Sequence, residues 1–518
     1  SIAWTLPRQQ LAEVRSQAEL GTEEEFVKMS FDSPDPEPPA GLTKPGLRPR
    51  LAFLGPGIIL ASVTIGSGEL VWASRSGAIF GYGMLWCFLY AGLFKAIQVH
   101  TAARHFTLTG EHPMVGWRKL PGPPLWFPLL VAVPAVLLMP IAFSGIPEML
   151  GGYIHRFVGM EPASGSVGPW KHLEFWINVW TSIVLCFCLA LALASSYRML
   201  ERVSLVVLGV MVACVACSVV VLGPNLLEML GGLFIPRVSD FPDFVLKPEY
   251  AREFAGRSPW LEVSLYLSAV GGGAYDYIGY VGMLREKEWG LAGRRVAGRD
   301  ELEAAVAGDT AASAETVRRA RAWARAPLLD TSVSFFFVIL VTLLFGILGT
   351  LVLHRESVVP ANSNLLNEQE AFLTLLHPEL RWVYRAGVFL ALVGTLYGAF
   401  EVYRFTFVES VRAILPEWAT AERVPYLRAG TVAYCFLGGL VMVWLPETVA
   451  GTIVGRMTFG TIISGAATCG LWCFAMLWLD RTRLPAPLRM GRVTWWLTLI
   501  AGLGMTFMGI QTIIAYFR

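Results

Sequence analysis

The sequence predicts an all-α integral membrane protein in which two helices are interrupted near the middle of the bilayer. Mean hydropathy is +0.54 and only 15% of the 518 residues are charged, whereas soluble domains carry about a quarter. Apolar segments recur at lengths that suit a bilayer of about 30 Å, which a helix crosses in about 20 residues. Two of these segments contain clusters of glycine, and such clusters favour local unwinding of a helix.

Residues 1–50 are predicted to form a polar cytoplasmic tail and a linker. The tail is mixed in charge and has no cleavable signal-peptide pattern. Its stretch SPDPEPPAGLTKPG is rich in prolines, which favour an extended tether over a packed structure.

About eleven apolar spans follow the tail. They lie at roughly 51–79, 83–105, 125–153, 173–197, 203–223, 260–284, 330–353, 384–410, 429–446, 451–479 and 493–516. Arginines gather in the loops after the even-numbered spans. By the positive-inside rule, the N-terminus is expected in the cytoplasm and the C-terminus outside. The expected location is the plasma (inner) membrane, with the lipid bilayer as the surrounding partner.

The span count predicts two inverted repeats of five helices each, followed by an eleventh helix. The first repeat would occupy residues 51–223, and an extracellular loop would follow at 224–259. The second repeat would occupy 260–479, with a cytoplasmic loop at 285–329, and residues 480–518 would hold the eleventh helix and the C-terminus. The 285–329 loop has the pattern of a surface helix pair with a basic end. Positive-inside charge explains that pattern better than nucleic-acid binding does.

The two glycine clusters lie in the first and sixth spans. Residues 66–68 read GSG, and residues 271–273 read GGG. Unwound backbone inside a membrane is tolerated only where it is buried in protein or lines a cavity. Interrupted helices at equivalent places in two repeats indicate a transport site near the bilayer midplane. The alternative is that these glycines only allow helices to pack closely.

Each cluster is followed by a carboxylate, Glu69 after GSG and Asp276 after GGG. A charge at the centre of a membrane helix costs at least about 2.5–3.5 kcal/mol, so it is normally paired, protonated or functional. The two carboxylates could face each other and hold a hard cation or share a proton. Alternatively, each could cap the N-terminus of its own half-helix.

Three cations, Arg75, Lys95 and Arg456, also lie within predicted spans. They would repel an approaching metal ion unless each is paired, and structural pairing is the simpler interpretation. As a second interpretation, they are possible contacts for an anionic substrate. Arg404 and Glu401, one helical turn apart, are expected to pair with each other.

Several stretches resemble the Nramp family of proton-coupled divalent-metal transporters. The first span begins GPG and continues GAIFGYGMLW, similar to the family pattern GAxFGYxLLW, and the second ends in a similar arginine-containing stretch closing in TG. Glu148 lies in EMLG, which is similar to the family's EviG, and Asp330 precedes the seventh span as in the family. The resemblance covers residues 51–353 and implies a LeuT-type 5+5 inverted-repeat fold of the APC superfamily.

The departures from the family lie at its metal-binding motifs. The family's DPGN in the first helix aligns with residues 66–69, so the metal-binding aspartate is missing. The family's MPHN in the sixth helix aligns approximately with residues 275–278, and its methionine and histidine are absent. In the third span the family's second acid falls at Gly145, which leaves only Glu148 of the proton-path pair.

The expected function is that of a Nramp-related secondary-active transporter for a hard divalent cation, Mg or Mn, either coupled to protons as a symporter or uncoupled, with Glu69 and Asp276 as the metal ligands. Glu69, Asp276 and Glu148 are the candidate proton carriers. Two alternatives stay open: a transporter of an amino acid or small organic anion held by the GSG break, and a family relative that has lost metal transport. The expected substrate contacts are Gly66, Ser67, Gly68, Glu69, Gly272, Gly273, Tyr275, Asp276 and Tyr277.

No catalytic motif stands in a credible context, so no enzyme activity, catalytic residue or cofactor is expected. The eight cysteines all fall inside apolar runs, which favours packing over a zinc site or a disulfide framework.

Overall fold

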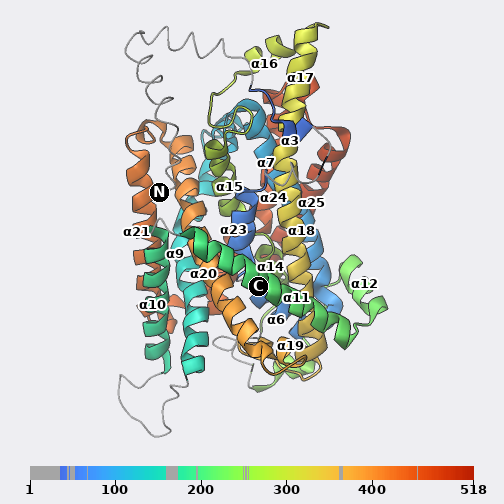
Figure 1. Cartoon of the computed structure of the whole chain (residues 1–518), viewed down its shortest axis with the longest axis vertical. Coiled ribbons are helices and arrows are strands. Elements are labelled where there is room, and N and C mark those ends of the chain that lie inside the picture. Colours follow the sequence, from blue (N-terminus) through green and yellow to red (C-terminus); the bar gives the residue numbers. More distant parts are fainter. Residues whose placement is uncertain are drawn as a thin grey trace.

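The computed structural model describes residues 36–43, 46, 53–66, 68–158, 173–193, 197–248, 250, 254, 256–360, 366–451 and 453–517. All regular secondary structure in these residues is helical (Figure 1). Most of the predicted N-terminal tail, and Ser67 of the GSG break, lie outside the described residues. The all-helical membrane fold expected from the sequence is confirmed.

Uninterrupted helices account for most of the predicted spans. Within the described residues, seven helical stretches are long and apolar enough to cross a bilayer. The long helices are α7 (Leu85–Thr109), α9 (Trp126–Val158), α10 (Leu173–Leu193), α11 (Tyr197–Leu222), α18 (Arg325–Leu348), α20 (Leu380–Ile414), α21 (Val424–Trp444) and α25 (Arg492–Phe517).

The first, sixth and tenth spans are each built from two half-helices. The pairs are α5 (Pro56–Thr64) with α6 (Ala73–Phe80), α14 (Pro259–Ala269) with α15 (Ala274–Lys287), and α23 (Ile453–Ser464) with α24 (Ala466–Arg483). The first two breaks are the predicted ones. The sequence had predicted a single helix over 451–479, and this prediction is wrong because the tenth span changes direction at Gly465.

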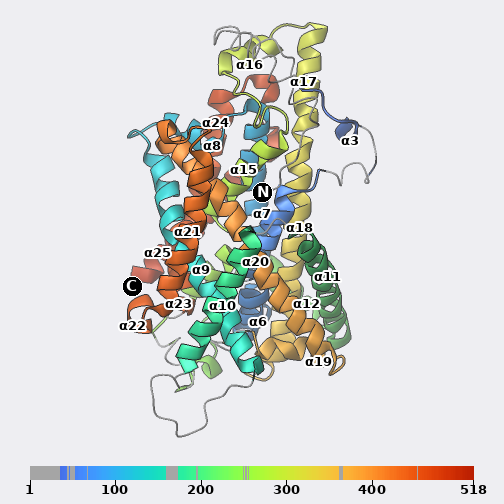
Figure 2. The same cartoon turned by 60° about the vertical axis from the view of Figure 1, so that its left-hand side comes forward.

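Short helices mark the two ends of the molecule. The 285–329 loop forms the predicted helix pair, α16 (Arg299–Val306) and α17 (Ala311–Trp323), at the upper end of Figure 1. At the lower end lie α12 (Leu226–Phe234) and α19 (Ala371–Thr374). We call these the α17 end and the α12 end. Turning the molecule shows that α9, α10 and α21 lie together on one side, while α11 and α18 lie on the other (Figure 2).

Asp330 of α18 fixes the start of the first span. Its buried carboxylate accepts the backbone N–H groups of Gly55 (2.9 Å) and Gly57 (2.8 Å), and the Tyr280 hydroxyl donates to it at 3.0 Å. A side chain at Gly57 would put its Cβ 2.8 Å from the Asp330 carboxyl carbon, so only glycine fits there. This contact explains the GPG pattern and ties α5, α15 and α18 together at the α17 end of the breaks.

Candidate functional site

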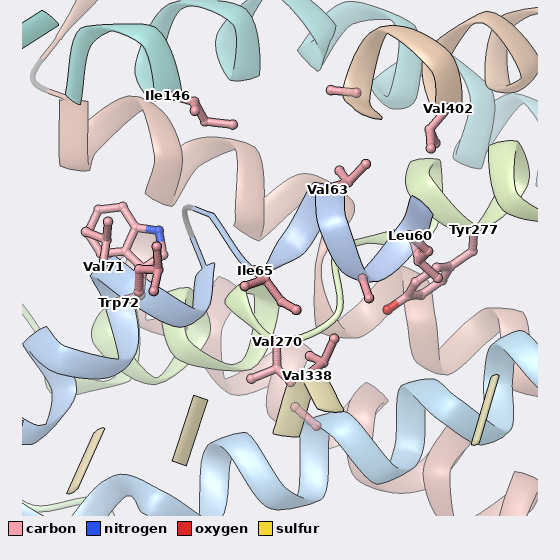
Figure 3. Packing of buried hydrophobic residues seen from close by; sticks show 14 of the residues in the cluster. Leu60, Val63, Ile65, Val71, Trp72, Ile146, Val270, Tyr277, Val338 and Val402 are labelled. Carbon is pink, nitrogen blue, oxygen red and sulfur yellow. The ribbon is translucent and has the colours of Figure 1, made fainter. Parts of the chain in front are cut away.

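The two predicted breaks lie next to each other in the buried interior. The first span leaves α5 after Thr64 and resumes as one π-helical stretch, η1 (Gly68–Trp72), before α6. The sixth span leaves α14 after Ala269 and resumes at α15. Figure 3 shows Ile65 of the first break pointing toward Val270 of the sixth, with Val338 of α18 beside it. The two irregular segments are therefore enclosed by protein, as a membrane requires.

Glu69 links the first break to the sixth. Its side chain is fully buried, and its Oε1 accepts the backbone N–H of Gly271 at 3.2 Å. The Thr64 hydroxyl lies close to this carboxylate but donates to the Ala61 carbonyl at 3.1 Å. The second oxygen, Oε2, is buried without a hydrogen-bond partner among the described residues. Glu69 thus reaches across to the other broken helix and leaves one oxygen for another ligand.

Asp276 acts on its own helix. Its Oδ2 accepts the N–H of Gly273 at 2.7 Å and so caps the N-terminus of α15. This is the local capping role that the sequence left open as an alternative. Its other oxygen, Oδ1, is also buried without a partner in the described chain. The two breaks therefore each present one carboxylate oxygen without a donor.

Lys95 of α7 holds the unwound part of the sixth span. Its ammonium is 1% exposed and donates to the carbonyls of Ser268 (3.1 Å), Val270 (2.8 Å) and Gly272 (2.6 Å). It also lies within electrostatic reach of Glu69 and Asp276. The lysine therefore occupies a position between three carbonyl oxygens that a free cation could otherwise fill.

A cavity of about 80 Å³ lies beside the breaks. Thr64 and Gly68 line it from the first span, and Gly272, Tyr275 and Asp276 line it from the sixth. Tyr403 of α20, and Ala142 and Ile146 of α9, close other sides. This volume suits a small ion with few waters, since pockets for larger organic ligands measure about 300–1,000 Å³.

Other predicted contacts lie around this cavity rather than on its wall. Tyr277 is fully buried, and its hydroxyl donates to the Gly272 carbonyl at 3.2 Å. Gly273 supplies the N–H that Asp276 accepts. Gly66 packs against Thr395 of α20, whose hydroxyl donates to the Ser62 carbonyl at 3.1 Å. Ser67 falls in the part of the chain that the structure leaves undescribed.

Arg75 has a partner that sequence analysis missed. Both side chains are fully buried, and the guanidinium meets the Glu262 carboxylate of α14 through two contacts of 3.3 Å. It also donates to the Pro360 carbonyl at 2.7 Å. Tyr266 donates a further hydrogen bond of 2.7 Å to Glu262. An acid within the predicted sixth span, in the stretch WLEVSLY, was the signal that could have identified this pair.

Two further arginines within the predicted spans also form ion pairs. Arg456 of α23 is ion-paired with Glu148 of α9. Arg404 pairs with Glu401 at 2.9 Å, which confirms that prediction. Arg75, Lys95 and Arg456 are thus all engaged with groups of the chain itself.

The tenth span adds a residue that no motif indicated. The half-helix α23 packs against α14, and its Met457 lines the cavity. The Met457 sulfur also packs against Gly145, where a Cβ would lie 3.0 Å from it. Gly145 is the position at which the resembling family carries its second acid. The Ser464–Gly465 pair inside an apolar run was the available sequence signal for this break.

Part of the chain is similar in sequence to a known family. Residues 57–246 match the model described as natural resistance-associated macrophage protein-like (Nramp). Metal transporter Nramp1 of Oryza sativa subsp. japonica is 28% identical over 200 residues, which cover 38% of this chain and 35% of the relative. Metal transporter Nramp2 of Arabidopsis thaliana is 26% identical over 226 residues, which cover 43% of this chain and 40% of the relative. The chain thus spans 35% and 40% of the length of these two relatives.

A solved structure matches over nearly the whole chain. The Eremococcus coleocola manganese transporter, in complex with an aromatic bis-isothiourea substituted compound, superposes with a TM-score of 0.53 at 15% identity. The match covers 92% of this chain and 90% of that one. At this identity the match shows a shared fold, and the sequence match over residues 57–246 adds the family likeness. Over residues 57–246 the chain is similar to the Nramp family, and as a whole it shares the helical fold of the Eremococcus coleocola manganese transporter.

Proposed function

We propose that this chain is a secondary-active transporter that carries a hard divalent cation, Mg²⁺ or Mn²⁺, through a site between its two broken helices. The observation that carries the proposal is the pair of buried carboxylate oxygens without donors, Glu69 Oε2 and Asp276 Oδ1. Asp276 lines the small cavity, Glu69 follows directly after Gly68 of its lining, and a cation would satisfy both oxygens.

The ligand chemistry favours a cation that keeps some of its water. No cluster of three or more His, Cys, Asp or Glu side chains able to hold a metal occurs in the described residues. Mg²⁺ is commonly held by one or two carboxylates while it retains several waters, which fits Glu69 and Asp276. Met457 is the one soft ligand on the cavity wall, and a sulfur contact would favour Mn²⁺ over Mg²⁺.

The positive charges near the site support a cation rather than an organic anion. Arg75 is held by Glu262, Arg456 by Glu148, and Lys95 by three carbonyls. A carboxylate substrate would have to displace one of these partners. The cavity volume of about 80 Å³ also leaves little room for an amino acid in this conformation.

Proton coupling and orientation are part of the proposal. Glu69 and Asp276 are buried at the site, so a proton could replace the cation there on the return step. Glu148, whose side chain is 21% exposed, would carry protons only if Arg456 moved away from it. We place the α17 end in the cytoplasm and the C-terminus outside, in the plasma membrane, because arginines are concentrated at the α17 end.

Uptake by proteoliposomes tests the proposal. We expect Glu69→Gln and Asp276→Asn each to lower the initial rate of Mn²⁺ or Mg²⁺ uptake at least about tenfold, because each removes a ligand charge while keeping the side-chain shape. Glu401→Gln is the matched control: it removes an intramembrane carboxylate that is paired with Arg404 and belongs to α20, outside both breaks. This control should transport at nearly the wild-type rate.

Two results would change the conclusion. Normal uptake by both Glu69→Gln and Asp276→Asn would overturn the site. No metal-dependent uptake at millimolar concentration, together with uptake of a member of an amino-acid panel, would assign an organic substrate instead. An inward proton gradient that leaves metal uptake unchanged would remove proton coupling from the proposal.

A further inference from the structure

A second cavity lies where α24 ends and α25 begins, at the α17 end. It has a volume of about 280 Å³. Three arginines, two tryptophans and one aspartate make up most of its lining: Arg481, Arg489, Arg492, Trp495, Trp496 and Asp480. It takes no part in the site between the breaks, so the inference drawn from it stands apart from the proposed transport activity.

The arginines of this cavity outnumber its carboxylates three to one. Among the ion pairs of the described residues, none joins Arg481, Arg489 or Arg492 to a carboxylate. Asp480 is already engaged, since it pairs with Arg104 at 3.1 Å and accepts the backbone N–H of Met490 at 3.0 Å. The lining therefore presents three guanidinium charges and no free carboxylate, which is a surface suited to a phosphate group.

Two of these guanidinium groups are held in position before any ligand arrives. Arg489 donates to the carbonyls of Leu484 (3.0 Å) and Arg481 (3.1 Å), and its other N–H groups stay available. The Arg481 guanidinium lies 5.4 Å from the centre of the Trp495 ring. The indole N–H of Trp495 is itself buried without an acceptor in the described chain. Preorganised donors of this kind reduce the entropy that a ligand loses on binding.

The surface below the cavity is apolar. Along α25 a stripe of exposed side chains at helical spacing leads away from it toward the α12 end: Val493 (73% exposed), Leu497 (42%), Ile500 (50%), Leu503 (58%) and Phe507 (58%). Tryptophan and arginine in the first turn of a membrane helix are typical of the membrane–water interface. A ligand with an anionic head and an apolar tail would match both parts.

We propose that this cavity binds the phosphate headgroup of an anionic phospholipid, with its acyl chains along the α25 stripe. Basic pockets at membrane-helix ends bind anionic headgroups through such charge-assisted hydrogen bonds. A free phosphate ion shares the headgroup chemistry but would make no use of the stripe.

Thermal unfolding of the full chain in nanodiscs tests this proposal. Wild-type protein should unfold at a higher temperature in phosphatidylcholine discs with roughly 30–50% phosphatidylglycerol than in phosphatidylcholine alone. Arg481→Gln/Arg492→Gln should lose at least about half of that shift, because two of the three charges are removed. This variant leaves Arg489 and its backbone hydrogen bonds in place, so its unfolding temperature in phosphatidylcholine alone should match the wild type.

Arg423→Gln is the matched control, because Arg423 also stacks over a tryptophan, Trp418, at 5.2 Å, and does not line this cavity. It should keep the full phosphatidylglycerol shift. An undiminished shift in Arg481→Gln/Arg492→Gln, or an equal loss in Arg423→Gln, would overturn the site. Equal stabilisation by inorganic phosphate in phosphatidylcholine discs would show a free-anion site and overturn the lipid assignment. Metal uptake is not the readout, so failure here leaves the transport proposal untouched.

Discussion

The two broken helices differ in how the polar groups at their breaks are hydrogen-bonded. The first break resumes directly in a π-helical stretch, and its carboxylate, Glu69, reaches out to a backbone N–H of the sixth span. The sixth break is a short loop in which Gly271 and Gly272 have positive φ, and its carboxylate, Asp276, caps its own half-helix. Its carbonyls are satisfied from outside, by Lys95 of α7. The first break thus contributes a side chain that contacts the sixth, whereas the backbone of the sixth break is held by side chains from other helices.

This difference indicates which part of the site depends on its surroundings. Unwound backbone in a membrane has no water to satisfy its polar groups, so each donor and acceptor needs a protein partner. The sixth break obtains these partners from two other helices, through Lys95 and Glu69. We therefore expect the sixth break to be sensitive to substitutions in other helices. The first break should be less sensitive to them.

Replacing Lys95 should have the largest effect. Lys95→Met removes three hydrogen bonds to buried carbonyls and the cation near two buried carboxylates, a loss of about 3–5 kcal/mol in the free energy of unfolding. Denaturant unfolding of the purified protein in mixed micelles measures this loss. Lys247→Met replaces an exposed lysine, and it should stay within about 0.5 kcal/mol of the wild type. If Lys95→Met had the wild-type free energy of unfolding, the Lys95 ammonium would not be needed to stabilise the sixth break.

Glycine-to-alanine substitutions should destabilise the two breaks for different structural reasons. Gly272 has φ +79°, and an added Cβ would lie 2.5 Å from Asp276 Oδ2, so Gly272→Ala combines the left-handed backbone cost of about 1–2 kcal/mol with a clash against that carboxylate. Gly66 is not in that region, but its Cβ would lie 2.9 Å from the Thr395 Cβ, and overpacking costs about 1–3 kcal/mol. The same unfolding measurement in mixed micelles gives both values.

Thr395→Ala distinguishes the two mechanisms. It removes the hydroxyl that a side chain at Gly66 would meet, so it should recover part of the stability lost in Gly66→Ala. It should recover none in Gly272→Ala, whose cost comes from the backbone and from contact with Asp276 and not from Thr395. A double-mutant cycle should therefore give a coupling above about 0.5 kcal/mol for the first pair and none for the second. Equal coupling in both pairs would contradict the assignment of steric and backbone causes.

The sequence was sufficient to predict the helical fold and the positions of both breaks. Glycine clusters within apolar runs are local signals, and residues 66–68 and 271–273 carried them. The third break, at Gly465, was missed because a single Ser–Gly pair within an apolar run is also compatible with a continuous helix.

Partners across helices were harder to predict than positions along them. Nothing in the spacing of Lys95 indicates that it meets three carbonyls of the sixth span, because this contact depends on how α7 packs against α14. Arg75 and Glu262 are 187 residues apart in sequence, whereas Arg404 and Glu401 are three apart. Only the second pair follows a helical period, and it was the one predicted.

Removing the two carboxylates should have the smallest and most local effects on stability. Asp276→Ala removes the cap of α15, which costs about 0.5–2 kcal/mol, and should raise the exchange rate of the Gly273 amide. Glu69→Ala removes the hydrogen bond to Gly271, about 1 kcal/mol, and should raise exchange at that amide about fivefold. Hydrogen exchange read by mass spectrometry with single-amide fragmentation resolves the two sites.

The pattern of exchange decides whether the breaks are coupled in the way that the hydrogen bonds indicate. Because Glu69 belongs to the first span and Gly271 to the sixth, Glu69→Ala should loosen the sixth break while the amides of α5 keep their protection. Asp276→Ala should leave the first break unchanged, since no described hydrogen bond runs from Asp276 to it. Faster exchange in α5 after Asp276→Ala would show that the sixth break also stabilises the first. The dependence would then not run only from the sixth break to the first.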